Sequence, residues 1–226
     1  MIVGVTAGSF AWRDLEEAFS RAIDDWGFDL IEFDAARLGP IGCAQSGLLA
    51  QRFGASVGLH AALDPAPGSS DLIGTALADL RVQCEDALAQ YARISLPWGT
   101  APLLAGPSSV QAVLPDYEAA GIRLLLPFGA GGERERAAIA ATASGFWLDL
   151  DQVAGAIDAM GTDGAKRAGG VLVSIDDVQG SERVRLLRRL RDLGFRAPCL
   201  LAAGGSSGAD RLRSGAERLR EILAGN

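Results

Sequence analysis

The chain has 226 residues, 49% of them hydrophobic, and a formal net charge of −7 at pH 7. This length suits one complete β/α barrel and lies near the upper limit of what a single hydrophobic core supports. The negative charge argues against a nucleic-acid partner, because contacts with phosphates require clustered cations.

The sequence also indicates the compartment. No run approaches the roughly 18 uninterrupted apolar residues that a membrane span requires. The N-terminal residues MIVGVTAGSF carry no basic leader, so we expect neither a signal peptide nor a membrane partner. The three cysteines are scattered and form no CxxC motif, which is typical of a reducing compartment. We therefore expect a cytoplasmic protein.

Short apolar runs recur along the chain, each followed by a loop and a helical pattern. They span residues 2–6, 29–34, 56–60, 93–97, 122–127, 146–151, 170–176 and 197–203. The first intervening segment shows the helical period, with Leu15, Phe19 and Ala22 on one face. Strand–helix alternation repeated eight times predicts an α/β fold, a single (β/α)8 barrel spanning residues 1–226. A doubly wound open sheet is the alternative.

Side-chain alternation predicts which residues face the inside of the barrel. Positions that face the helices must be apolar. Leu148 and Leu150 are such positions in residues 146–151, so their neighbours face inward. The same rule, applied to every strand, places the following residues inside: Thr6, Glu32, Asp34, His60, Ser95, Pro127, Trp147, Asp149, Asp151, Ser174 and Asp176.

The inward polar residues gather at strand ends, where barrel enzymes carry their catalytic groups. We expect Glu32, His60, Asp149, Asp151 and Asp176 to surround one cavity. Crowded carboxylates raise one another's pKa and can then act as acid and base near neutral pH. The alternative is that these carboxylates cap helices and accept hydrogen bonds from loop amides.

Aromatic residues mark the loops at the same ends of the strands. Phe10, Trp12 and Trp98 follow the first and fourth strands and are candidates to hold a substrate, together with the inward-facing Asp151 and Ser174. An acidic and aromatic mouth favours a small organic ligand, neutral or cationic, with some apolar surface.

Four short strings resemble strands of the xylose isomerase-like barrels, a family that includes sugar phosphate isomerases, epimerases and endonuclease IV. GFDLIEF at residues 27–33 and VGLHA at 57–61 are similar to the second and third strands of that family. WLDLDQ at 147–152 and LVSIDD at 172–177 are similar to the sixth and seventh. The resemblance covers the barrel by element order and implies isomerase or epimerase activity.

The resemblance also implies a divalent metal, bound by a glutamate ending strand five, an aspartate on strand six, a histidine on strand seven and a glutamate ending strand eight. Asp149 matches the aspartate. Pro127, Ser174 and either Ala202 or Ala203 stand at the other three positions. We therefore expect no metal and no other cofactor.

One alternative to this expectation stays open. Carboxylates alone can hold Mg²⁺ through oxygen ligands, and Glu32, Asp149, Asp151 and Asp176 could supply them.

The leading hypothesis is a metal-independent isomerase or epimerase, or a related lyase or cyclase, acting on a small hydroxy-carbonyl substrate. Asp149 or Asp176 would remove a proton, the other carboxylate or Glu32 would return it, and His60 would polarise the oxygen. The alternative is a catalytically inactive barrel that binds a ligand or a protein partner. A homo-oligomer is left open.

Overall fold

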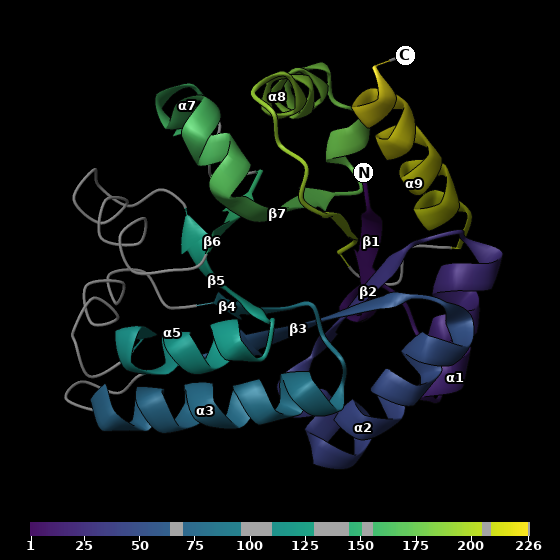
Figure 1. Cartoon of the computed structure of the whole chain (residues 1–226). Helices are drawn as coiled ribbons and strands as arrows, with labels where there is room; N and C mark the ends of the chain where they lie inside the picture. Colours follow the sequence, from purple (N-terminus) through teal and green to yellow (C-terminus); the bar gives the residue numbers. More distant parts are fainter. Residues whose placement is uncertain (64–69, 96–109, 129–144, 151–155, 205–208, 226) are drawn as a thin grey trace.

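The computed structural model describes residues 1–63, 70–95, 110–128, 145–150, 156–204 and 209–225. Eight parallel strands form a closed barrel in chain order, with helices outside it (Figure 1). This confirms the predicted barrel and excludes the open sheet. The strands are β1 (Val3–Thr6), β2 (Leu30–Asp34), β3 (Ser56–Ala62), β4 (Tyr91–Ser95), β5 (Arg123–Phe128), β6 (Gly145–Asp149), β7 (Ala168–Ser174) and β8 (Cys199–Ala202).

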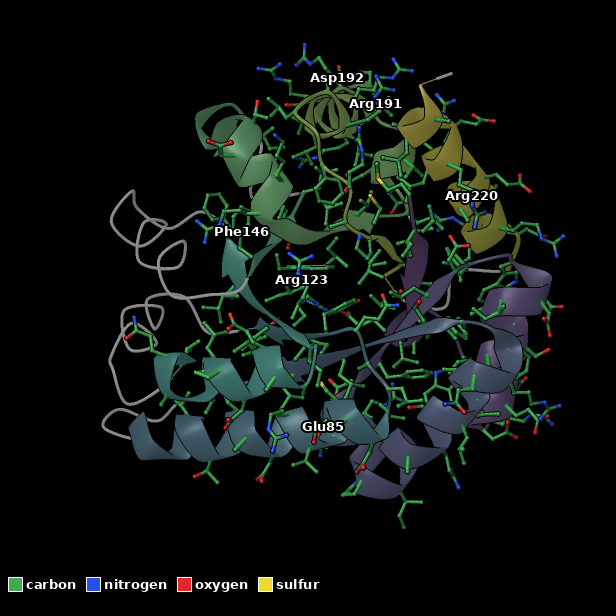
Figure 2. All side chains as sticks on the ribbon, viewed as in Figure 1. Glu85, Arg123, Phe146, Arg191, Asp192 and Arg220 are labelled. Carbon is green, nitrogen blue, oxygen red and sulfur yellow. The ribbon has the colours of Figure 1, made fainter. Side chains whose placement is uncertain are left out.

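The helices connect successive strands on the outside of the barrel. The α-helices are α1 (Leu15–Phe19), α2 (Ala35–Phe53), α3 (Ser70–Asp86), α5 (Val110–Ala119), α7 (Ala156–Arg167), α8 (Ser181–Asp192) and α9 (Ala209–Ala224). Three short elements are η1 (Ala7–Ser9), the π-helical η2 (Ser20–Asp25) and η3 (Asp177–Gln179). Figure 2 shows charged side chains such as Arg191, Asp192 and Arg220 along the outer helices α8 and α9. None of the described helices is long and apolar enough to cross a membrane.

The buried apolar residues divide into two clusters, as strand alternation requires. The larger cluster fills the space between barrel and helices and includes Val5, Phe33 and Leu148. A smaller cluster fills the barrel interior and consists of Leu30, Tyr91, Leu125, Trp147 and Leu200. The predicted parity of β2 and β6 is therefore confirmed.

Two glycines make room for the large rings in the barrel interior. A Cβ added to Gly58 on β3 would lie 2.2 Å from the ring of Tyr91. A Cβ added to Gly170 on β7 would lie 2.3 Å from the ring of Trp147. Real Cβ atoms do not approach other atoms this closely, so both rings depend on glycine in the facing strand.

Most strand boundaries differ from the prediction by one or two residues, and three of these differences bear on the site. β4 begins at Tyr91, two residues earlier than expected, because Tyr91 and Ala92 are also buried and pair with β3. β6 and β7 end at Asp149 and Ser174, each two residues earlier than expected. Beyond β7 the chain turns into η3, so side-chain alternation no longer applies to residues 175 and 176.

Candidate functional site

A cavity of about 300 Å³ opens at the carboxyl ends of the strands, the face at which barrel enzymes work. Its walls come from β1, β2, β3, β4, β7 and β8 and from the segments that follow β1 and β2. The lining residues are Thr6, Ala7, Gly8, Trp12, Glu32, Phe33, Asp34, Arg37, Leu38, His60, Arg93, Leu172 and Ala202.

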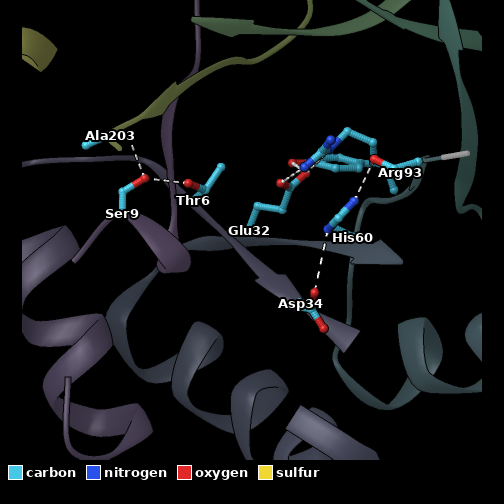
Figure 3. A network of polar contacts seen from close by, with 9 residues as sticks. Thr6, Ser9, Glu32, Asp34, His60, Arg93 and Ala203 are labelled. Carbon is cyan, nitrogen blue, oxygen red and sulfur yellow. Dashed lines mark hydrogen bonds and ion pairs between the residues drawn. The ribbon is translucent and has the colours of Figure 1, made fainter. Parts of the chain in front are cut away.

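Glu32 and Arg93 form a buried ion pair in the wall of this cavity (Figure 3). Glu32 is only 2% exposed. Its two carboxylate oxygens accept from Arg93 Nε at 2.8 Å and from Arg93 Nη2 at 2.6 Å. The Tyr91 hydroxyl donates to the same carboxylate at 3.3 Å. A carboxylate and a guanidinium that share two hydrogen bonds hold each other in a fixed orientation.

Arg93 is also supported by an aromatic ring. Its guanidinium carbon lies 4.7 Å from the centroid of the Trp147 ring, and Trp147 in turn stacks on Tyr91. Burial alone would lower the pKa of Arg93, but the charge and the hydrogen bonds of Glu32 raise it above its ordinary value. Arg93 is therefore a permanent cation, fixed inside the barrel.

His60 lies on the neighbouring strand and contacts two polar partners (Figure 3). Its Nε2 is 2.8 Å from Ser95 Oγ, and its Nδ1 is 3.8 Å from an Asp34 carboxylate oxygen. Burial and the charge of Arg93 lower the pKa of His60, although Glu32 and Asp34 oppose this. The ring is consequently neutral at pH 7 and can donate one proton and accept another.

Asp34 ends β2 and begins α2. Its Oδ1 accepts hydrogen bonds from the backbone N–H groups of Ala36 and Arg37, at 2.9 and 3.1 Å. These bonds cap the first turn of the helix. The cap fixes the carboxylate beside His60, so helix capping and site geometry depend on the same side chain.

The barrel closes beside the cavity through a chain of small polar groups. Thr6 Oγ1 and Ser9 Oγ are 2.6 Å apart. Ser9 Oγ also accepts from the backbone N–H of Ala203, at 2.8 Å. These contacts join the segment after β1 to the end of β8 (Figure 3).

Trp12 and Phe10 were both predicted to hold a substrate, and the structure places them differently. Trp12 lines the cavity, its Nε1 donates to the carbonyl of Ala7 at 3.0 Å, and the guanidinium of Arg37 lies over its ring. Phe10 is buried and packs edge-on against Trp26, with ring centroids 4.8 Å apart. Phe10 is thus a core residue outside the cavity lining, and its predicted contact with substrate is not supported.

The carboxylates of β6 and β7 are also placed differently. Asp149 ends β6 and is partly buried. Its charge helps to raise the pKa of Arg93, so Asp149 lies near that arginine. Asp176 has a side chain that is 77% exposed and pairs with Arg211 on α9. The prediction that Asp176 faces the cavity is wrong, because β7 ends before it and the following turn directs it outward.

Ser174, the last residue of β7, is partly buried, and its Oγ accepts from the backbone N–H of Asp176 at 3.3 Å. It does not line the cavity. Trp98 and Asp151, the two remaining predicted site residues, lie outside the described residues.

The residues at the family's metal positions do not fit a metal ion. Pro127, Ser174 and Ala202 offer no carboxylate or imidazole, which leaves Asp149 alone. Within the described part of the chain, no group of three or more His, Cys, Asp or Glu side chains is placed to hold a metal ion. Two of the carboxylates proposed as Mg²⁺ ligands are engaged elsewhere. Asp176 pairs with Arg211, and both oxygens of Glu32 are bound by Arg93.

The sequence prediction missed Arg93 and Tyr91. The signal was present, because Ser95 was assigned to the inside of its strand and residues 91 and 93 share its parity. An arginine in that inward row is unusual, since lone charged groups are rarely buried without a partner. The partner, Glu32, had itself been predicted to face inward.

No family model matches the chain, and no curated protein does. Solved structures do resemble it. A D-psicose 3-epimerase from Clostridium cellulolyticum H10, solved with D-tagatose, is similar over 99% of this chain and 98% of its own, with 14% identity and a TM-score of 0.75. An L-ribulose 3-epimerase is similar over 99% and 93%, with 16% identity and a TM-score of 0.73.

A xylose isomerase domain-containing protein from Salmonella typhimurium LT2 is also similar, with 13% identity and a TM-score of 0.70 over 98% of this chain and 97% of its own. The chain therefore has the fold of the xylose isomerase-like barrels, as the four strings in the sequence indicated. At these identities the likeness establishes the fold alone.

The comparisons correct one expectation. The solved structures include D-psicose 3-epimerase and L-ribulose 3-epimerase, enzymes for which the family resemblance implies a divalent metal. The expectation that this protein uses no cofactor is therefore contradicted by the enzymes whose fold it shares.

Proposed function

We propose that this protein catalyses isomerase- or epimerase-type proton transfer on a small hydroxy-carbonyl compound bound in the rim cavity. The observation that carries the proposal is the meeting of Glu32, His60 and Arg93 in one cavity at the working face of the barrel. The same fold in proteins named D-psicose 3-epimerase and L-ribulose 3-epimerase supports this class of reaction.

The roles follow from charge and position. Asp149 is the proposed base that removes a proton from carbon, because it ends β6, is partly buried and lies close enough to Arg93 for its charge to raise the pKa of that arginine. Glu32 is the proposed second carboxylate. His60 is neutral and lines the cavity, so a substrate oxygen that replaces Ser95 at Nε2 would receive its hydrogen bond.

Trp12 would cover the substrate. Its ring lines the cavity and is fixed by its hydrogen bond to Ala7 and by the guanidinium of Arg37 above it. An aromatic face suits the C–H surface of a sugar-like compound while the polar wall opposite binds hydroxyl groups.

Solvent exchange tests the proposal directly. The protein is incubated in D2O with D-tagatose, D-allulose, D-fructose or L-ribulose, with Mn²⁺ supplied, and deuterium in the carbon-bound positions is measured by NMR. Asp149→Asn should reduce incorporation by about 100-fold or more. Asp176→Asn is the matched control and should stay close to wild type, because that side chain lies outside the cavity. Wild-type protein that incorporates no deuterium would refute the proposed reaction.

A second function, ligand binding without chemistry, is favoured by one observation. Both oxygens of Glu32 are already bound by Arg93 and Tyr91, which suits a fixed structural carboxylate better than one that exchanges protons. A sugar that raises the melting temperature but incorporates no deuterium would support this function.

We also propose that the protein works in the cytoplasm. All three cysteines, Cys43, Cys84 and Cys199, are buried and free, which fits a reducing compartment. A homo-oligomer stays a proposal, and sedimentation would test it.

A further inference from the structure

The cavity wall contains a cation whose hydrogen-bonding capacity is only partly used. The side chain of Arg93 is 10% exposed and borders the cavity. Glu32 accepts from its Nε and Nη2. The Nη1 amino group has no acceptor among the described residues, although a guanidinium presents five N–H donors.

Several features of the barrel fix this guanidinium in place. Trp147 lies against its face, and Tyr91 donates to the carboxylate that orients it. Gly58 and Gly170 leave space for those two rings. A salt bridge needed only for stability would not require this much support, because buried ion pairs contribute little compared with apolar packing.

We propose that Arg93 is a catalytic residue of the proposed reaction, and that its Nη1 group binds the carbonyl oxygen of the substrate. When the base removes the proton from the adjacent carbon, the C–H electron pair moves into the carbon–carbon bond and negative charge develops on that oxygen. The guanidinium stabilises this charge without transferring a proton. Return of a proton to carbon restores the carbonyl group and leaves Arg93 unchanged. This inference rests on the proposed function.

The charge balance also selects the substrate class. Glu32 already compensates the charge of Arg93, and Asp149 adds a further negative charge nearby. A ligand that carries a full negative charge at this oxygen before reaction would leave an uncompensated charge in a buried site, which is costly. The oxygen bound by Arg93 should therefore belong to a neutral carbonyl group.

The experiment compares Arg93→Lys with wild type. Lysine keeps the positive charge but loses the planar fork. We expect kcat for deuterium exchange to fall roughly 10- to 1000-fold while KM changes much less, as for removal of one oxyanion donor. Arg123→Lys is the matched control, because Arg123 begins β5, at the end of the strand opposite the cavity. A double variant, Arg93→Met with Glu32→Gln, is compared with Glu32→Gln alone, so that loss of the second carboxylate is common to both proteins, and a lower kcat in the double variant supports the role of Arg93.

A binding measurement separates this inference from the proposed function. Arginine side-chain N–H resonances, assigned with Arg93→Lys, are followed by NMR while D-tagatose, D-allulose, D-fructose or L-ribulose is added. We expect the Arg93 resonances to shift and those of Arg123 to stay unchanged. Shifts without deuterium exchange would refute the proposed reaction and leave the binding role intact. Exchange with an unchanged kcat in Arg93→Lys, or no shift of the Arg93 resonances with any of the sugars, would overturn the inference.

Discussion

The two halves of the barrel rim differ in how their polar residues are used. On β2, β3 and β4, the inward residues form two pairs, Glu32 of β2 with Arg93 of β4 and His60 of β3 with Ser95 of β4. On the opposite half, Pro127, Ser174 and Ala202 occupy strand ends, and Asp176 pairs outward with α9. The comparison teaches that an inward position on a strand is not enough. A site residue also needs a partner on another strand that holds its polar group in place.

The largest effect should follow from removing Arg93, one partner of the ion pair in the half formed by β2, β3 and β4. Arg93→Met leaves the carboxylate of Glu32 buried without its cation, which we expect to destabilise the fold by about 3–5 kcal/mol. The free energy of unfolding in urea measures this. Adding Glu32→Gln should restore most of the loss, because no charge is then buried alone. A double variant no more stable than the single one would contradict this account.

A smaller effect should follow from adding a methyl group against the Tyr91 ring in the same half of the barrel. Gly58→Ala places a Cβ against the Tyr91 ring, and we expect a loss of about 1–3 kcal/mol as the ring shifts. Gly8→Ala is the control, since a Cβ there meets nothing within 4 Å. Thermal unfolding compares the two variants, and equal melting temperatures would argue against close packing at Tyr91.

The stability of the half that contains His60 should also depend on pH. Burial lowers the pKa of His60 in the folded protein, so the unfolded chain takes up its proton at a higher pH than the folded one. Wild type should lose stability relative to His60→Gln as the pH falls below about 6.5, the ordinary histidine pKa. Above that pH the difference between the two proteins should be constant. Urea unfolding from pH 8 to pH 5 measures it, and parallel curves over the whole range would count against a lowered pKa.

The smallest effect should come from the other half. Asp176 and Arg211 have side chains 77% and 53% exposed, and exposed ion pairs contribute about 0–1 kcal/mol. Asp176→Asn should therefore change the free energy of unfolding by less than about 1 kcal/mol. A loss as large as that of Arg93→Met would show that the two halves do not differ as described.

Much of the fold could be predicted from the sequence, because strand alternation and helical periodicity are local properties. The eight apolar runs, and the inward orientation of Glu32 and His60, required only that the helix-facing side be apolar. The same reasoning failed for Asp176, because the end of a strand depends on the turn that follows and carries no clear signal in the apolar pattern. Phe10 failed for a similar reason, since its contact with Trp26 depends on how α1 and η2 pack.

The candidate site was less predictable than the fold. Parity places Arg93 inside once Ser95 is placed there, yet nothing local indicates that its partner is Glu32, which lies 61 residues earlier. Such pairing depends on the order and register of the strands around the barrel. The contact between Asp34 and His60 likewise follows from register, because these two residues are aligned between β2 and β3.

The closure of the barrel has a consequence for how the protein reaches its working form. β1 pairs with β8, so Val3 aligns with Cys199 at the far end of the chain. The cavity needs both strands, since Thr6 and Ala202 lie in its lining. A chain truncated before β8 would expose two unpaired strand edges, which favour aggregation, and it would lack one wall of the site. The site is therefore complete only when β8 has paired with β1, and contacts between such distant segments slow this closure.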